Sequence, residues 1–592
     1  MQSFKLRHIT SLWLVLGMGL AACAGAEPTP QPQPALTVFP SPSPATTATH
    51  TPTPLPTSTL TPTPSPISAR PELLLSQMTL EQKVGQVMAI GFGATAFIPE
   101  VKALLNDLHI GAIVIFDANI ESPTQLAQLI RDAQEATQAN GDPALIVAVD
   151  QEGGPVARLR ENVGFTEFPS AMAIAATGDV NNARLVAQAM AGEMKAVGIN
   201  MNLAPDMDVN NNPANPIIGI RSFGSDPLKV SEFGVAVITA YQSAGIACVA
   251  KHFPGHGDTA VDSHLGLPMI PYDLARLNAI ELVPFRAAKD AGIAGIMSAH
   301  ITFPAIDDTP DLPGSLSAKV QTGLLRTGLP ESLQFDGLAV SDSLEMGALE
   351  SAGFTTPKAA AQALVAGADL LTFNSTLDVY RETHALIVSK VQSGEIPQAR
   401  LDAAVRRVLR AKERFGVLDG ALVDVASVAA KVGLSETKQL SADIAAKSIT
   451  LVRDAAKLLP LKTDAKLAVI ETPYAVGLSA AFGTPGIDVG VLQVSEQPQP
   501  FEIEQAVSFA EGKTVIVATY DVAINPTQAD LVNALLKANV PVIVIATRSP
   551  YDALYVKDAP TVIAIYGTPL FAGLAAALRG QMPMLGVLPV AL

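Results

Sequence analysis

Short apolar runs alternate with longer amphipathic stretches from residue 71 to about residue 417. The runs are rich in β-branched residues, and apolar positions recur at helical spacing between them, which is typical of parallel strands joined by crossover helices. Eight such runs occur, at residues 87–91, 112–116, 144–149, 201–204, 246–250, 295–298, 337–341 and 369–373. This pattern predicts a (β/α)8 TIM-type barrel over residues 71–418. An open, doubly wound sheet is the structural alternative.

Several of these runs end in a polar residue that a buried strand does not need. These residues are Asp150, Asp206, Lys251 with His252, His300, Asp342 and Asn374. The C-terminal strand ends of such a barrel converge on the active site, so we expect catalytic groups to gather there.

A second, smaller unit is predicted over residues 435–592. A helical stretch at 441–446 leads into an apolar run at 448–452, and further runs at 467–470, 514–518, 540–546 and 561–565 alternate with helical stretches. This alternation predicts an α/β sandwich.

The first 22 residues have the layout of a secretory signal peptide. Lys5 and Arg7 precede an apolar stretch at 9–20 that is too short to span a membrane as a helix. The string LAAC that ends at Cys23 resembles a bacterial lipobox, which implies cleavage before Cys23 and acylation of that residue. Two or three acyl chains would anchor the protein on the outer side of the cell membrane. Plain secretion with cleavage elsewhere is the alternative.

Residues 23–70 are mostly Pro, Thr and Ser. Such a stretch cannot bury apolar surface and favours extended polyproline geometry. It is therefore predicted to be a linker that holds the folded part away from the membrane.

The composition narrows the choice of partners. The formal net charge is −16 and the pI is about 5.0, and phosphate binding needs a basic face, so a nucleic-acid partner is excluded. Cys248 is the one cysteine outside the predicted signal segment and Cys23, so no intrachain disulfide can form in the folded part.

The densest group of titratable residues is the string KHFPGHGDTAVDSHLGLP at 251–268, with three of the eight histidines. Asp262 stands two residues before His264, a spacing at which a carboxylate can hold one imidazole nitrogen and leave the other facing a substrate. The spacing is neither the helical i, i+4 pair nor the Cys/His knuckle of common zinc sites. A zinc site nevertheless stays open as an alternative reading of these histidines.

The second candidate group is LAVSDSLEMGAL at 338–349, where a buried run ends in Asp342. A carboxylate at the end of the seventh barrel strand is well placed to attack an anomeric carbon. Glu345, which falls past the strand end, is the rival nucleophile.

These two strings resemble the signature of glycoside hydrolase family 3, in its β-N-acetylglucosaminidase branch, and the resemblance extends from residue 74 to 592. It implies that Asp342 is the nucleophile and that His264, tuned by Asp262, is the acid/base, where the usual glycosidase has two carboxylates. The implied activity is retaining, exo-acting release of terminal N-acetyl-β-D-glucosamine from cell-wall or chitin-type oligosaccharides. Neither a cofactor nor a metal is implied.

The resemblance also implies residues that contact the sugar. These are Asp150 and Arg158 in VDQEGGPVARL, Arg221 in GIRSFGSDP, and Lys251 with His252. Asp206 matches a position near the site whose role is less certain. Family members often carry Arg where this chain has Pro155, which leaves the shape of that loop open.

Two other functions compete with this interpretation. A family 3 β-glucosidase or β-xylosidase would use a carboxylate of the second domain as its acid/base, and the Asp262-Ser263-His264 triplet argues against it. A non-catalytic, cell-wall-binding lipoprotein is disfavoured because both a nucleophile and an acid are present. The natural oligosaccharide, and the choice between water and phosphate as acceptor, stay open.

Overall fold

The computed structural model describes residues 69–483, 488–567 and 571–592. The predicted signal peptide, Cys23 and the predicted linker up to residue 68 lie outside this part of the chain. Within it, no helix combines the length and the apolar character that crossing a membrane requires.

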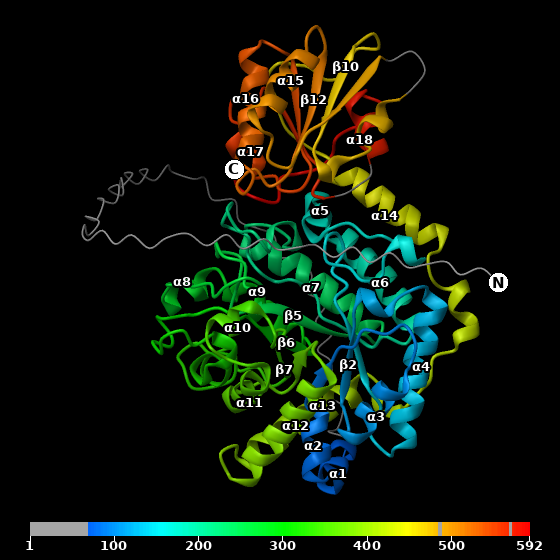
Figure 1. Ribbon diagram of the computed structural model, residues 1–592, viewed down its shortest axis with the longest axis vertical. Helices are drawn as coiled ribbons and strands as arrows, with labels where there is room; N and C mark the ends of the chain where they lie inside the picture. Colours follow the sequence, from blue (N-terminus) through cyan, green and yellow to red (C-terminus); the bar gives the residue numbers. More distant parts are fainter. Residues whose placement is uncertain (1–68, 484–487, 568–570) are drawn as a thin grey trace, which may run out of the picture. The chain divides into compact units, whose positions relative to one another are not determined.

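Eight parallel strands form the first sheet, in the order β7-β6-β5-β4-β3-β2-β1-β8. They are β1 Met88–Ile90, β2 Ala112–Ile115, β3 Ile146–Val149, β4 Met201–Asn202, β5 Ala247–Phe253, β6 Gly295–Ser298, β7 Leu338–Ser341 and β8 Leu371–Phe373. Figure 1 labels β2, β5, β6 and β7 of this sheet. A bridge between Val340 and Leu370, with a hydrogen bond from the Ser341 N–H to the Leu370 carbonyl, joins the two edge strands. The predicted TIM-type barrel is confirmed, and the open-sheet alternative is wrong.

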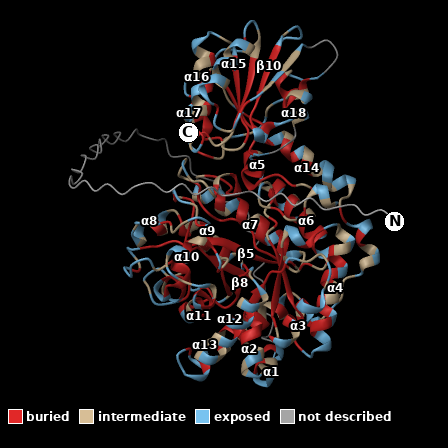
Figure 2. Ribbon diagram, in the orientation of Figure 1, coloured by how far each residue is buried: buried red, intermediate tan, exposed pale blue. Residues whose placement is uncertain are grey.

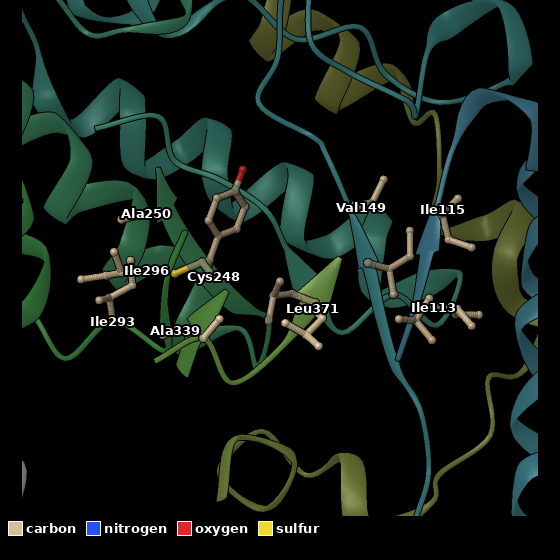
Figure 3. Packing of buried hydrophobic residues seen from close by; sticks show 14 of the residues in the cluster. Ile113, Ile115, Val149, Cys248, Ala250, Ile293, Ile296, Ala339 and Leu371 are labelled. Atoms are coloured by element: carbon tan, nitrogen blue, oxygen red, sulfur yellow. The ribbon is translucent and has the colours of Figure 1, made fainter. Parts of the chain in front are cut away.

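Alternate residues of each strand face opposite sides of the barrel wall. Val114, Val249 and Val340 belong to the apolar cluster inside the barrel. Their neighbours Ile113 and Cys248 belong to the larger cluster between strands and helices, part of which Figure 3 shows. Cys248 is buried there as a small apolar residue.

Helices cover the outside of the barrel and turn one buried face toward the strands (Figure 2). They are α1 Arg70–Gln77, α2 Leu80–Gln86, α3 Pro99–Asp107, α4 Pro123–Ala139, α5 Ala171–Ala176, α6 Val180–Ala196, α7 Pro227–Ser243, α8 Leu274–Ala279, α9 Leu282–Asp290, α10 Gly347–Ser351, α11 Thr356–Ala366, α12 Leu377–Gln392 and α13 Gln398–Arg414.

Local sequence accounts for the start and the orientation of α4. The Ser122 hydroxyl accepts the Gln125 N–H, the Gln125 side chain returns to the Ser122 N–H, and Pro123 occupies the first turn. Leu126 and Ile130, four residues apart, then point at the strands.

The C-terminal domain is built on a six-stranded sheet in the order β11-β10-β12-β13-β14-β9, in which only the β14–β9 pair is antiparallel. The strands are β9 Thr450–Asp454, β10 Leu467–Glu471, β11 Val489–Gln493, β12 Thr514–Thr519, β13 Val542–Ala546 and β14 Thr561–Ala564. The helices are α14 Ser435–Ser448, α15 Pro500–Phe509, α16 Thr527–Lys537, α17 Asp552–Tyr555 and α18 Phe571–Leu578. Separate apolar clusters lie on the two faces of this sheet, as an α/β sandwich requires.

Candidate active site

The strand register directs three predicted site residues toward the barrel axis. Each stands two residues beyond an inward-facing apolar residue of its own strand: Asp150 after Ala148, Lys251 after Val249 and Asp342 after Val340. Because side chains alternate with a period of two, each polar residue continues the inward face at the C-terminal end of its strand. The structure therefore brings together residues that are far apart in the sequence.

Asp342 directly follows β7, and its Oδ1 accepts the Ser343 N–H at 2.8 Å. Burial acts to raise the pKa of this carboxyl, but His252, His300, the Ser343 N–H and Lys251 outweigh it, so its pKa lies below the ordinary value. Asp342 is thus held as a carboxylate, the form that a nucleophile needs.

His300 fixes the turn that carries Asp342. One ring nitrogen, Nδ1, lies 2.6 Å from the Ser315 hydroxyl, and Nε2 lies 2.9 Å from the Ser343 carbonyl oxygen. Since a carbonyl only accepts, Nε2–H is the donor to Ser343. Burial lowers the pKa of His300, so the ring holds this turn as a neutral group.

The rival carboxylate Glu345 has other partners. Its Oε1 accepts the Ser343 hydroxyl and the Asn374 N–H, both at 2.8 Å. Burial raises the pKa of Glu345. This side chain therefore links the segment after β7 to the end of β8.

Asp262 and His264 lie on the segment between β5 and α8, and their side chains meet. The distance from His264 Nδ1 to Asp262 Oδ1 is 2.8 Å, and the same oxygen accepts the His264 N–H. Among the described residues His264 Nε2 has no hydrogen-bond partner, and the side chain is 57% exposed. A ring held at Nδ1 by a carboxylate and open at Nε2 has the geometry of a general acid/base.

Contacts with α10 and with His256 hold this segment close to the stretch that follows β7. The Ala348 N–H donates to the Ser263 carbonyl at 3.2 Å, and a Cβ on Gly347 would lie 2.5 Å from the His264 carbonyl oxygen. His256 Nε2 lies 3.0 Å from the Ser263 hydroxyl. The segment with Asp262 and His264 is therefore attached to the stretch that begins only a few residues after Asp342.

Glu152 joins two of the predicted sugar contacts, and our sequence analysis missed it. Both of its oxygens accept from the Arg221 guanidinium at 2.9 Å, and Lys251 Nζ lies 2.7 Å from Oε1. Burial acts to raise the pKa of Glu152, but Arg221 and Lys251 outweigh it and lower the pKa to about 2. The available signal was its position two residues after Asp150.

His252 is oriented by Asp208, the second residue that the sequence analysis missed. Its Nδ1 lies 2.7 Å from Asp208 Oδ2, and its Nε2 lies 3.2 Å from Arg221 Nη2. Because a guanidinium only donates, Nε2 accepts and Nδ1–H donates to Asp208. Burial and the Arg221 charge lower the pKa of His252 to about 4, which keeps this ring neutral.

The remaining predicted contacts lie on or next to the β3–α5 segment. Lys251 Nζ donates to Asp150 Oδ1 at 2.8 Å, and Arg158 Nη1 donates to Asp117 Oδ2 at the same distance. The segment turns sharply after Glu152, since Gly153 has a φ of 92°.

The three histidines of the zinc alternative bind different partners, although the rings of His252 and His256 lie edge to face with their centroids 5.7 Å apart. Each ring has a different nearest partner: Asp208 for His252, Thr259 and Ser263 for His256, and Asp262 for His264. A different group, Asp206 with Asp208 and His252, has ligand atoms within 4.8 Å of one another. In that group His252 Nδ1 already donates to Asp208, and the Arg221 charge lies 3.8 Å from Asp206, which favours hydrogen bonding over a cation.

Burial raises the pKa of Asp206 to about 8 and that of Asp208 to about 7. Asp206 accepts the Asp208 N–H through Oδ1. Its Oδ2 is buried without a hydrogen-bond partner among the described residues.

Residues 79–411 match the N-terminal domain of glycosyl hydrolase family 3. The chain is 32% identical over 400 residues to β-hexosaminidase A of Pseudoalteromonas piscicida, a match that covers 64% of this chain and 65% of that relative. It is 34% identical over 345 residues to β-hexosaminidase LpqI of Mycobacterium tuberculosis, covering 58% and 85%. The solved structure of a family 3 β-N-acetylglucosaminidase from Paenibacillus sp. str. FPU-7 is 35% identical, with a TM-score of 0.79 and coverage of 87% and 99%. This chain therefore belongs to glycosyl hydrolase family 3, a family of enzymes that cleave glycosidic bonds.

Proposed function

We propose that the protein is a retaining, exo-acting glycoside hydrolase that releases terminal N-acetyl-β-D-glucosamine from cell-wall or chitin-type oligosaccharides. The names of relatives more than 30% identical to the chain, β-hexosaminidase and β-N-acetylglucosaminidase, support this choice of sugar. The observation that carries the proposal is the Asp262–His264 pair, attached through Ser263 to the stretch after Asp342.

In the proposed first step, an Asp342 carboxylate oxygen forms a bond to the anomeric carbon as the bond to the leaving oxygen breaks. His264 Nε2–H gives its proton to that oxygen. In the second step His264 takes a proton from water as the water oxygen attacks the anomeric carbon, and the bond to Asp342 breaks. The two inversions give net retention.

Lys251, Arg221, His252 and Arg158, with the carboxylates that hold them, are proposed to bind the sugar. Lys251, with Asp150 as its partner, offers a hydrogen-bond donor at the barrel mouth, and Arg221 is fixed by Glu152. The neutral His252 ring, which Asp208 holds in place, is proposed to form a polar wall of the sugar site. Arg158 is proposed to complete this group from the β3–α5 segment.

The test compares leaving groups. A sugar alkoxide leaves slowly unless it is protonated, whereas a nitrophenolate leaves almost unaided. His264→Ala should therefore lower kcat/KM on chitobiose about 10²–10⁴-fold. The loss should be far smaller in the glycosylation step with nitrophenyl N-acetyl-β-glucosaminide. Asp342→Ala should abolish both reactions, since no covalent intermediate can form. Asp262→Ala should behave as a weaker His264 variant.

Glu345→Gln is the matched control and should keep most of the activity on both substrates. Equal losses of kcat/KM for His264→Ala on the two substrates would contradict the role of His264 as the acid. The acid would then be Glu345 or a carboxylate of the second domain. Conversion of a nitrophenyl glucoside or xyloside in preference to the N-acetylglucosaminide would favour the β-glucosidase or β-xylosidase alternative.

We also propose that the enzyme works outside the cytoplasm, anchored to the cell membrane through acylated Cys23. The LAAC string and the Pro/Thr/Ser-rich linker after it support this location.

A further inference from the structure

A cavity of about 530 Å³ lies apart from the predicted catalytic and sugar-contact residues. Its walls include Pro155 and Arg160 of the β3–α5 segment, Lys438 of α14, and Tyr474, Tyr520 and Arg548 of the C-terminal domain. We call it the Tyr474 pocket. Its volume falls within the range of about 300–1,000 Å³ that is typical of small-molecule sites.

The Tyr474 pocket lies at the point of the C-terminal sheet where α/β folds bind ligands. Strand β10 lies between β11 and β12. The connection that leaves β10 therefore leads to β11, toward one edge of the sheet, and the connection that leaves β12 leads to β13, toward the other edge. Connections that diverge in this way open a crevice at the carboxyl ends of the two strands. Tyr474 follows the end of β10 and Tyr520 follows the end of β12 directly.

The two tyrosines form a flat aromatic surface. Their rings stack with centroids 3.7 Å apart and planes 13° apart. The Arg548 guanidinium lies 5.4 Å from the centroid of the Tyr520 ring and donates to the Tyr520 hydroxyl. Tyr474 is 49% exposed, so the stack presents it as a rigid ring with surface left for a ligand.

The charges around the pocket are already balanced. Arg160 pairs with Glu167 at 3.5 Å, Lys438 with Glu161 at 3.0 Å and Arg548 with Asp521 at 2.8 Å. An ionic ligand would have to displace one of these pairs, whereas a neutral polyol can hydrogen-bond to both members. A ligand with an apolar face for Tyr474 and hydroxyls for these pairs fits best.

We infer that the Tyr474 pocket is a non-catalytic binding site for a neutral pyranose. Such a sugar stacks its axial C–H face on Tyr474 and turns its hydroxyls toward the Arg160–Glu167 and Lys438–Glu161 pairs. Pro155 belongs to the same β3–α5 segment as Asp150 and Arg158, so the pocket lies on a segment that also serves the catalytic site. The sugar is either a further unit of an oligosaccharide or a free monosaccharide. The choice of N-acetylglucosamine as the probe rests on the proposed function.

The experiment measures binding to the full chain carrying Asp342→Asn, which prevents turnover. N-Acetylglucosamine, chitobiose and chitotetraose are titrated by calorimetry with and without Tyr474→Ala. Loss of one of two N-acetylglucosamine sites identifies a free monosaccharide as the ligand. A three- to tenfold loss of affinity for chitotetraose alone identifies a further unit of the chain, consistent with one aromatic contact.

Phe501→Ala is the control, because Phe501 is 68% exposed in the same domain and does not line the pocket. Tyr474→Phe keeps the ring and should keep the binding. Unchanged titrations with Tyr474→Ala, for these sugars and for glucose and xylose, would overturn the inference. Binding of a sugar-free cell-wall stem peptide that Tyr474→Ala abolishes would overturn it as well.

Catalysis is measured separately on the nitrophenyl substrate, whose cleavage requires only the catalytic site. Tyr474→Ala in the otherwise unchanged chain should leave kcat on this substrate as it is. If the unchanged protein fails to cleave the nitrophenyl substrate, the proposed function is refuted. A loss of pyranose binding in the Tyr474→Ala titrations would still support the Tyr474 pocket as a sugar-binding site.

Discussion

At the scale of single residues, the site depends on buried charges that hold one another. Glu152, Arg221 and Lys251 are each almost fully buried, and such groups remain charged only because each faces an opposite charge. The low pKa of Glu152 expresses this dependence. Positioning in this site is therefore electrostatic.

Replacing Glu152 tests that statement. Glu152→Gln leaves two buried cations short of a negative charge, so the free energy of unfolding should fall by about 3–5 kcal/mol. On the nitrophenyl substrate KM should rise and kcat/KM should fall by about 100-fold or more, because Arg221 and Lys251 lose their fixed positions. Denaturant unfolding and steady-state kinetics measure the two effects.

Glu135→Gln is the control, since Glu135 pairs with Arg131 on the exposed face of α4. Its effect on stability should stay within about 0.5 kcal/mol. Wild-type KM in the Glu152 variant would show that the carboxylate does not position the sugar contacts.

At the scale of elements, carboxyl groups lie at strand ends or against them in both domains, and the balance between burial and neighbouring charges or donors sets their protonation. In the C-terminal domain Asp552 accepts the Thr519 hydroxyl at the end of β12 and the Val522 N–H. Burial raises its pKa from 3.8 to about 7. The folded chain therefore keeps a proton that the unfolded chain releases at lower pH.

The sign of the resulting pH dependence follows from linkage. The stability contributed by protonated Asp552 is fully present below about pH 4 and is lost as the pH rises through about 7. Asp552→Asn stays neutral at every pH, so the fall in Tm between pH 5 and pH 8 should be at least about 2 °C smaller in the variant than in the wild type.

Calorimetry at the two pH values makes this comparison. Asp558→Asn, a change at an exposed residue of the same domain, should keep the wild-type fall. An equal fall in the Asp552 variant would mean that Asp552 is ionised in the folded chain across this range.

At the scale of the whole molecule, the barrel and the α/β sandwich were predictable because most of their strands bury a short apolar run. Strand β11 was missed although its sequence, VGVLQ, contains such a run; it is an edge strand whose residues are only half buried or exposed. Strand β5 extends to Phe253, past the predicted run, which stopped before the polar Lys251; in the structure Lys251 still forms a β-bridge with Asp206. Asp208 and Glu152 were missed because their roles lie in contacts with residues distant in sequence.

The location of the molecule is tested at its N-terminal segment. If Cys23 is acylated, the wild-type protein should sediment with membranes and Cys23→Ser should be released or left unprocessed, since the acyl chains supply the membrane affinity. Fractionation followed by mass spectrometry of the N-terminus measures both outcomes. A Cys23→Ser protein that is processed and retained like the wild type would refute the anchor.

The attachment of the Asp262–His264 segment has a consequence for how the protein can change. Lys251 stands on a barrel strand, and Asp150 and Asp342 directly follow one. Asp262 and His264 stand on a connecting segment that a few local contacts hold to α10. Connections between elements accept insertion and replacement far more readily than strands do. A replacement for this segment would therefore have to supply its own proton donor, whereas the proposed nucleophile and the residues proposed to hold the sugar would stay in place on the barrel.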